Sequence, residues 1–538
     1  MSKRSFRFLP LTRRAFVRSL AAGAASTACA QALPPTPAYA NPQTLKFGQP
    51  FPFSFDALIA RARAQAAAPY KEPYRPAPDI VSKIDYDAHG KIRWKPELAL
   101  FADQSAGYPV TFFHLGQLFA KSIKMHELRA GQAREIVYSP HYFTMPADSV
   151  AQKMPKDSGF AGFRLHESRS RSDWKTQDWC AYLGASYLRA IGALGQYGLS
   201  ARGIAVNTTS TTPEEFPDFV EFFLEPAASD RDPINIYALL DGPSLSGAYK
   251  FACQRTSGVL MEIDCALFLR KDIAQLGIAP LTSMFWFAEY DRGFRIDWRP
   301  EVHDSDGLAI WNGTGERIWR PLNAPTRVVT SSFQDKRPRG FGLLQRDRVY
   351  EHYLDGVNYD KRPSLWVEPL GDWGEGAVQL VEIPTDDEIH DNIVAFWVSK
   401  QPAKSGSSLR YKYKLHWLAD EPYPATSVAH VFATRIGRGG EPGKPRPKGV
   451  TKFVLEFEGK PIDTLPTSDK LSADITASRG KISYVFVEPV GTTKRWRAQF
   501  DLSTEGNEPV ELRVFLKKGN VTLSETWLYQ LEPRSPTG

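Results

Sequence analysis

The stretch "GVLMEIDCALFL", residues 258–269, decides the fold class of this chain. Its apolar and polar residues alternate through MEIDC, a pattern typical of a β-strand with one buried face. The stretches "PINIYALL" (233–240) and "LRYKYKLHWL" (409–418) are equally rich in branched and aromatic residues, and Gly, Pro, Asn and Asp turns divide such segments. Strands that follow one another without helices between them favour sheet packed on sheet. We therefore expect an all-β protein.

A helix and a change of composition interrupt this pattern. The Ala-rich stretch "DALIARARAQAAAPY", residues 56–70, predicts one amphipathic helix. The stretch "IGRGGEPGKPRPKG", residues 436–449, is either an interdomain linker or a long loop just inside a second domain. The strand-like segments after it have the spacing of a small immunoglobulin-like sandwich. We place the domain boundary near residue 420, with a large β-sandwich over 41–420 and a small one over 421–538.

The N-terminus predicts export. Residues 1–40 contain six Lys and Arg, no acid, and a short apolar run that ends at the A-x-A sequence of residues 38–40. These features define a signal peptide, and Arg13 and Arg14 match the twin-arginine type. The apolar run is shorter than the ~20 residues of a permanent membrane span. We expect a periplasmic protein that is exported by the twin-arginine pathway and is not embedded in a membrane.

The charge and the cysteines exclude several classes of function. Removing the six basic residues of the signal peptide lowers the 67 Lys and Arg to 61, against 60 Asp and Glu. A nearly neutral mature chain has no overall field to attract nucleic acid. Cys180, Cys253 and Cys265 remain, and without C-x-x-C spacing they are expected to be buried free thiols, with one disulfide at most. No dinucleotide, P-loop or haem motif appears, so no cofactor is predicted.

The stretch "EVHDSDGLAIWNGTGERIWRPL", residues 301–322, raises three possibilities: a metal site, a nucleotide-sugar D-x-D motif, or one carboxylate of an acid/base pair. In an extended chain Asp304 and Asp306 share one face and His303 points to the other, so a metal site using all three needs a turn. No second His cluster offers further metal ligands, and nucleotide sugars are not available outside the cytoplasm. Asp306, beside Gly307, also fits a turn-capping role.

A second acid-rich stretch is "VEIPTDDEIHDNIVAFW", residues 381–397. Thr385 and Glu388 fit a capping box with two acids in the first turn, which predicts that a helix begins here. Asp391 differs, because it precedes "NIVAFW", an apolar run that predicts a buried strand. A carboxylate at that position is a candidate for a raised pKa and for a general acid, although a turn aspartate is the structural alternative.

Aromatic residues are dense around these acids, and sugar rings stack on such side chains, although core packing explains any one of them as well. They are Trp298, Trp311, Trp319, Tyr353, Tyr359, Trp366 and Trp373.

Several longer segments carry a resemblance to a known family. They include "YALLDGPSLSGAYKF", "RKDIAQLGIAPLTSMFWF", "HDSDGLAIWNGTGERIWRPL", "KRPSLWVEP", "EIHDNIVAFW" and "SETWLYQLEP". From about residue 45 to residue 533 the chain resembles the periplasmic glucan biosynthesis proteins OpgG and OpgD, also called MdoG and MdoD. The twin-arginine signal favours the D branch.

The resemblance implies a galactose-mutarotase-like β-sandwich joined to an immunoglobulin-like domain, and work on glucans with a β-1,2-linked backbone. It also implies membership of glycoside hydrolase family 186, which includes inverting endo-β-1,2-glucanases and transglycosylating relatives. By motif matching, Asp391 is the general acid, Asp304 the general base, and Tyr359 part of the proton path. No metal or cofactor is implied. A membrane glucan synthase is a further candidate partner. The alternative to an enzyme is a non-catalytic, glucan-binding scaffold for that synthase. Residues expected to contact the glucan are Trp311, Trp319, Trp366, Arg362 and Glu388.

Overall fold

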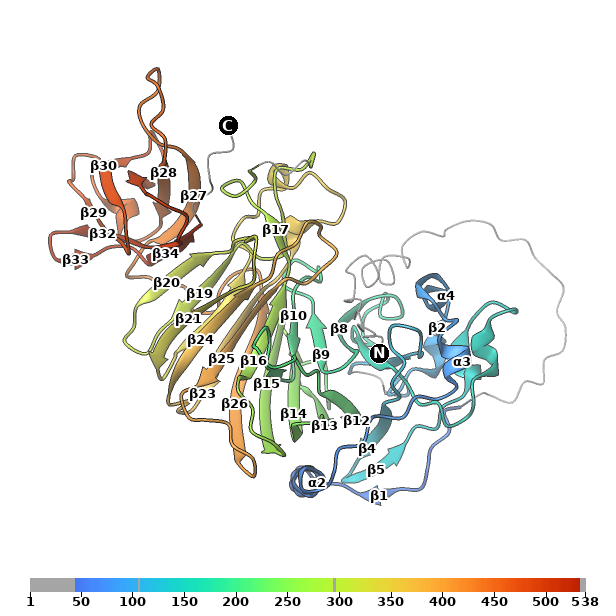
Figure 1. Ribbon diagram of the computed structural model, residues 1–538. Coiled ribbons are helices and arrows are strands. Elements are labelled where there is room, and N and C mark those ends of the chain that lie inside the picture. The colour runs from blue at the N-terminus through green and yellow to red at the C-terminus, as the bar shows by residue number, and fades with distance from the viewer. Residues whose placement is uncertain (1–43, 105–106, 294–296, 533–538) are drawn as a thin grey trace, which may run out of the picture.

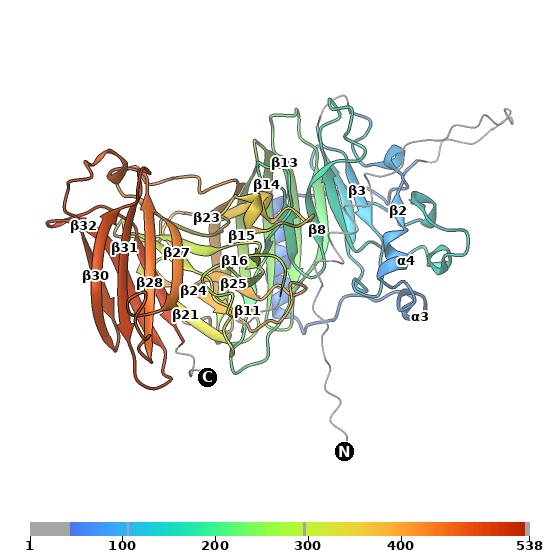
Figure 2. The same cartoon turned by 90° about the horizontal axis from the view of Figure 1, so that it is seen from above.

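The computed structural model describes residues 44–104, 107–293 and 297–532, so the predicted signal peptide of residues 1–40 lies outside it. Strands account for nearly all regular structure in these ranges, which confirms the all-β prediction. They form one large sandwich and a smaller C-terminal one (Figure 1). Viewed from above, strands β28, β30 and β31 lie at one end of the molecule and helices α3 and α4 at the other (Figure 2).

The larger sheet runs through the whole molecule. Within the described residues it has 16 strands. In spatial order they are β1 (Phe51–Pro52), β5 (Gln132–Glu135), β4 (Lys124–Arg129), β12 (Asp218–Glu225), β13 (Ile234–Asp241), β14 (Leu245–Arg255), β15 (Val259–Leu269), β26 (Ser408–Leu418), β23 (Ser364–Leu370), β22 (Gly340–Leu344), β19 (Gly307–Trp311), β20 (Arg317–Pro321), β34 (Thr526–Leu531), β32 (Val510–Lys518) and β29 (Ser472–Ala477), with β33 (Val521–Thr522) beside β32.

A second sheet packs against the first. In the described ranges it has ten strands, and the remaining strands form three smaller sheets. The ten are β21 (Val329–Lys336), β24 (Glu375–Glu382), β25 (Ile393–Ser399), β16 (Leu276–Ser283), β10 (Ser200–Arg202), β9 (Tyr187–Ala190), β8 (Asp178–Leu183), β7 (Gly162–His166) and β3 (Val110–Phe113), with β11 (Ala205–Val206) beside β16. The smaller sheets are β17 (Phe285–Phe287) with β18 (Val302–His303), β2 (Arg93–Trp94) with β6 (Phe143–Thr144), and β27 (His430–Arg438), β28 (Val450–Glu458), β31 (Trp496–Ser503) and β30 (Lys481–Pro489).

Strand β15 shows how the sequence pattern builds the core. One face, including Met261, Ile263 and Leu267, packs in the main core between the sheets. On the other face Ala266 and Phe268 are also buried, because helix α2 (Phe55–Ala67) covers them. This helix confirms the prediction for residues 56–70. The short helices α3 (Pro78–Val81) and α4 (Tyr86–Gly90), together with several 3-10 turns, complete the helical structure of the described residues.

Two smaller predictions are also resolved. Cys180, Cys253 and Cys265 are buried free thiols, as expected. None of the helices in the described ranges combines the length and the apolar character that crossing a membrane requires.

The two sandwiches share a sheet and a core. Residue 420 falls between β26 and β27, and residues 436–449 span the end of β27 and the loop to β28, so they are not an interdomain linker. Strand β34 then pairs in parallel with β20, with Trp527 opposite Trp319. Trp319, Trp366 and Trp527 belong to one buried cluster with the core of the small sandwich. The C-terminal sandwich therefore continues the larger sheet.

This shared core predicts the effect of one added methyl group. A Cβ at Gly340 would overlap the indole ring of Trp366, whereas a Cβ at Gly437 would meet nothing within 4 Å. Overpacking of a filled core costs about 1–3 kcal/mol. We expect Gly340→Ala to lower the free energy of unfolding by about that amount in urea titrations, and Gly437→Ala to have a much smaller effect. Equal stabilities for the two variants would contradict the shared core.

Candidate active site

Asp391 ends a loop that leads directly into strand β25. The helix predicted to begin at Thr385 is wrong, because residues 386–390 form bends and turns. The Thr385 hydroxyl donates to the Asp387 carbonyl at 2.7 Å and accepts from its N–H at 3.3 Å, so a local turn uses the hydroxyl that would have capped a helix. The strand prediction is confirmed, since the first five residues of β25 are buried.

The residue after Asp391 fixes the end of this loop. The buried Asn392 amide accepts from the Phe285 N–H at 2.9 Å and donates to the carbonyls of Phe285 and Ile383 at 2.9 Å each. One side chain thus ties both ends of the loop to strand β17. Asp391 therefore projects from a clamped backbone. Asn392 was not singled out in the sequence, where an Asp-Asn pair simply indicates a turn.

Asp391 faces a cation on the second sheet. Its Oδ2 lies 3.5 Å from Nη2 of Arg189, and the two side chains keep only 15% and 13% of their surface exposed. The hydroxyl of Ser200 accepts from Nε of Arg189 at 2.7 Å, which orients the guanidinium. Burial raises the pKa of the neighbouring Tyr187 to about 12; the charge of Arg202 opposes this change and the charge of Asp391 adds to it. The phenol therefore stays protonated.

Asp304 is fully buried directly after the short strand β18. Its N–H donates to the carbonyl of Met284 at 2.9 Å, and its Oδ1 lies 3.4 Å from Nε of Arg362. Full burial means that bulk water does not reach this carboxylate directly. A proton acceptor here requires a relay to the surface.

Arg362 lies beside Asp304 and close enough to Asp391 to respond to its charge. Its Nη1 donates to the carbonyl of Tyr197 at 2.7 Å, and its guanidinium lies 5.1 Å from the ring centroid of Tyr359. Burial lowers the pKa of Arg362, and negative charge opposes that effect. The groups that oppose it are Tyr359, Asp355, Glu388 and Asp391. Asp304 and Asp391, which approach from β18 and from the loop before β25, therefore act on one buried guanidinium.

Tyr359 and Glu388 also meet at this site. The buried Tyr359 hydroxyl donates to Oε2 of Glu388 at 2.8 Å. The same oxygen accepts from Nη1 of Arg299 at 2.6 Å. Burial works against the charge of Arg299, but hydrogen bonds to Asp297 and Glu388 outweigh it and raise its pKa. Neither Arg299 nor Arg189 was identified from the sequence, where an isolated arginine resembles ordinary surface charge.

The turn-capping role expected for Asp306 is not what the structure shows, because its carboxylate binds the backbone of a segment distant in sequence. Its Oδ2 accepts from the N–H groups of Arg346 and Asp347 at 2.9 and 2.8 Å. Burial raises the pKa of Asp306 to about 6, against the lowering effects of His303 and of these contacts.

The tryptophans predicted to stack on sugars differ in their exposure. Trp319 and Trp366 are buried in the core shared by the two sandwiches, so neither offers a ring face to a sugar in this conformation. Trp311 is partly buried, with the guanidinium of Arg317 3.8 Å from its ring centroid. Trp298 is 66% exposed and adjoins Arg299, so its ring is available for stacking beside the site.

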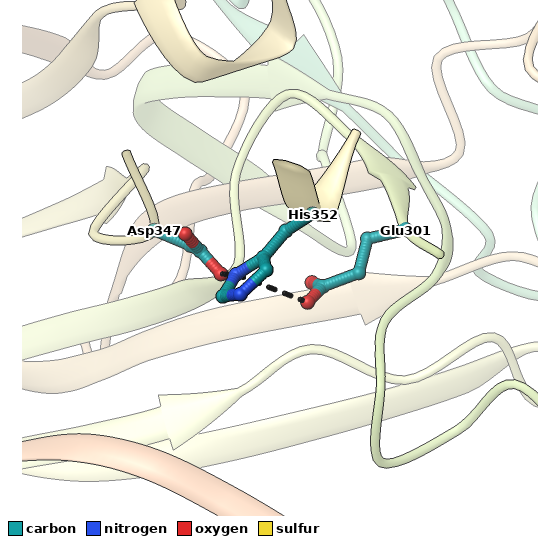
Figure 3. Close-up of side chains that lie close together, drawn as sticks. All are labelled: Glu301, Asp347 and His352. Carbon is teal, nitrogen blue, oxygen red and sulfur yellow. Dashed lines mark hydrogen bonds and ion pairs between the residues drawn. The ribbon is translucent and has the colours of Figure 1, made fainter. Parts of the chain in front are cut away.

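One group of side chains has the composition of a metal-ligand set. The ligand-type atoms of Glu301, Asp347 and His352 lie within 4.8 Å of one another (Figure 3). However, Nδ1 of His352 lies 2.5 Å from Oδ2 of Asp347 and 4.0 Å from Oε1 of Glu301. The imidazole thus occupies the space between the carboxylates. We describe the set as an ion-pair network and assign no metal to it.

A cavity of about 490 Å³ lies elsewhere, between strand β21 and the outer face of the β29–β32–β34 sheet. It is lined by Arg320, residues 330–333, 476–478 and 511–513, Leu528 and Gln530. None of the candidate catalytic residues lines it.

The fold and the cluster define a large two-sandwich protein with buried carboxylate and guanidinium groups close together. Residues 53–531 match the family model described as periplasmic glucan biosynthesis protein, MdoG. The chain is 58% identical over 530 residues to glucans biosynthesis protein D 2 of Ralstonia nicotianae, covering 97% of this chain and 98% of that protein. It is 46% identical over 532 residues to glucans biosynthesis protein D of Stenotrophomonas maltophilia, with the same coverage of 97% and 98%.

A further relative, glucans biosynthesis protein D of Xanthomonas campestris pv. campestris, is 44% identical over 530 residues, with coverage of 97% and 98%. The chain therefore belongs to the periplasmic glucan biosynthesis (MdoG) family.

Proposed function

We propose that this protein is exported by the twin-arginine pathway and cleaves linear β-1,2-glucan in the periplasm as an inverting endo-hydrolase. Asp391 donates a proton to the departing glycosidic oxygen, and Asp304 accepts the proton of the attacking water through a relay that includes Tyr359. The observation that carries the proposal is the pairing of Asp304 with the buried Arg362, in whose electrostatic surroundings Asp391 also lies, within a chain of the glucan biosynthesis family.

The different exposure of the two carboxylates supports these roles. Asp391 retains 15% side-chain exposure, so it can approach a bound sugar, whereas Asp304 is fully buried and needs a relay. An inverting mechanism requires room for water between acid and base. Tyr359 donates to Glu388 in this conformation. The relay therefore requires either that the Tyr359 hydroxyl turns toward Asp304 or that a water molecule bridges the two. Glu388 accepts hydrogen bonds from Tyr359 and Arg299, and Arg362 lies beside Asp304. The exposed Trp298, next to Arg299, offers a surface on which a sugar can stack.

Two other functions are alternatives to hydrolysis. A transglycosylase would keep Asp391 as acid but admit a sugar hydroxyl in place of water. A scaffold for a membrane glucan synthase would bind glucan without breaking it. The cavity between β21 and the β29–β32–β34 sheet, which the candidate catalytic residues do not line, is a second candidate binding site for such a scaffold. Chromatography of linear β-1,2-glucan after incubation with purified protein separates the scaffold from both enzymes, because only the enzymes change the chain length.

Substitution of the acid tests the roles. We expect Asp391→Asn to lower glucan turnover by ~10² or more, the scale of a lost general acid. Asp386→Asn is the matched control, because Asp386 is an exposed carboxylate on the same loop. Turnover is measured by release of reducing ends, and glucan binding by calorimetry. Equal turnover in the two variants would remove Asp391 from the mechanism.

Asp304→Asn should also lower turnover by ~10². Because this change leaves the buried Arg362 with less negative charge, its free energy of unfolding is measured in parallel. A turnover loss that matches the unfolded fraction at the assay temperature would indicate a structural role for Asp304.

Heavy-oxygen water separates hydrolysis from transfer. Hydrolysis places the label from water at every new reducing end, and we expect that outcome. Cyclised or lengthened products without label would assign the protein to the transglycosylases and leave the role of Asp391 unchanged.

A further inference from the structure

His303 precedes the candidate base and is completely enclosed. Its ring stacks on Phe285, with centroids 5.6 Å apart and planes 20° apart, and Tyr353 meets it edge-on at 5.3 Å. Nε2 lies 2.8 Å from Oε2 of Glu301, and Nδ1 lies 2.9 Å from Oε1 of Gln345. Both ring nitrogens therefore have an oxygen at hydrogen-bond distance.

The contacts of Gln345 fix the orientation of its amide. Its nitrogen faces the carbonyl oxygens of His303 at 3.3 Å and Tyr359 at 3.1 Å. The same nitrogen lies 2.9 Å from the hydroxyl of Tyr353, whose own hydrogen is donated to the carbonyl of Asp347. A flipped amide would place its oxygen against two carbonyl oxygens. The group facing Nδ1 of His303 is therefore the amide oxygen, which only accepts.

Two acceptors on opposite sides of one imidazole require two N–H donors. A neutral histidine carries one ring hydrogen, and the imidazolium carries two. The surroundings favour the charged form: burial opposes it, but the hydrogen bond and charge of Glu301, with the charges of Asp306 and Asp347, outweigh burial and raise the pKa of His303. The second oxygen of Glu301, Oε1, lies 4.0 Å from Nδ1 of His352 (Figure 3).

We propose that His303 is a protonated positioning residue, whose imidazolium bridges Glu301 and Gln345 and thereby holds the backbones of Asp304 and Tyr359 in register. Glu301 anchors one side of the ring. Gln345, bound to the other side, also binds the carbonyls of His303 and Tyr359, so the strand that carries the base and the segment that carries the relay tyrosine meet at one amide. The roles of Asp304 and Tyr359 rest on the proposed function, but the charge on His303 does not.

The pH dependence follows from the direction of the pKa change. Because folding raises the pKa of His303, its contribution to stability is complete below the unfolded value of about 6.5 and is lost as pH rises through the folded value. Above that pH, Nδ1 or Nε2 must face an oxygen without a hydrogen between them. The ordered site is then expected to loosen on the alkaline side.

Histidine NMR tests the charge directly. In protein labelled at the histidine ring carbons, the His303 signal is assigned by its disappearance in His303→Asn, among ten histidines. Since the pKa of His303 is raised, we expect its imidazolium shift to persist above the pH at which an ordinary histidine titrates. A His303 that titrates at or below its ordinary value in the folded protein would overturn the proposal, whether or not the protein cleaves glucan.

A pair of isosteric variants tests the positioning role. Glu301→Gln removes the anion but keeps its shape, and Glu368→Gln is the matched control, because Glu368 pairs with His416 at the same 2.8 Å. We expect Glu301→Gln to shift the alkaline limb of kcat/KM to lower pH, with turnover ~10-fold below wild type on that limb and largely recovered on the acid side, where His303 is protonated in both proteins. The control should keep the wild-type profile.

Recovery at low pH separates positioning from simple damage. A loss of turnover that is equal at all pH values, or an equal shift in Glu368→Gln, would contradict the positioning role. If wild-type protein turns over no glucan, the proposed function fails, and the NMR titration together with the pH dependence of the urea midpoint still decides the charge on His303.

Discussion

A guanidinium removed from water needs negative charge around it, and Arg362 meets this constraint at the centre of the candidate site. Its charge is stabilised by Asp304 at 3.4 Å and by the fields of Asp355, Glu388 and Asp391. Removing one partner of a buried ion pair is costly, because the remaining charge stays uncompensated. The positions of the acids, the contact with Tyr359 and the exclusion of bulk water therefore depend on one another.

Two layers of the sandwich supply this cluster. Strand β25 and the clamp made by Asn392 position Asp391 from the second sheet, while β18 and the segment around Tyr359 position Asp304 beside the first sheet. The imidazolium inferred at His303 links β18 to the Tyr359 segment. Such a site needs rigid elements from both sheets to hold its side chains in place, and the large core between the sheets supplies that rigidity.

Local patterns in the sequence predicted the strands, helix α2 and the buried cysteines, because period, propensity and burial are short-range properties. The capping-box prediction at Thr385 failed because the same residues satisfy a local turn, and tertiary contacts of Asn392 hold that turn. The stacking role expected for Trp319 and Trp366 depended on which face of each strand meets solvent. For Trp319 the parallel pairing of β20 with β34, which sets it opposite Trp527, decides that point, and no local pattern encodes a pairing so distant in sequence. Arg189 and Arg299 escaped for the same reason, since Asp391 and Glu388, the site acids that they contact, are distant from them in sequence.

The most direct test of the account is a crystal structure of Asp391→Asn with a linear β-1,2-glucan bound. The quantity to measure is the distance from the residue 391 side chain to the nearest glycosidic oxygen. The account predicts hydrogen-bond distance, about 3 Å, with the chain passing Trp298. A glucan seated instead in the cavity between β21 and the C-terminal sheet, with no glycosidic oxygen near residue 391, would contradict it.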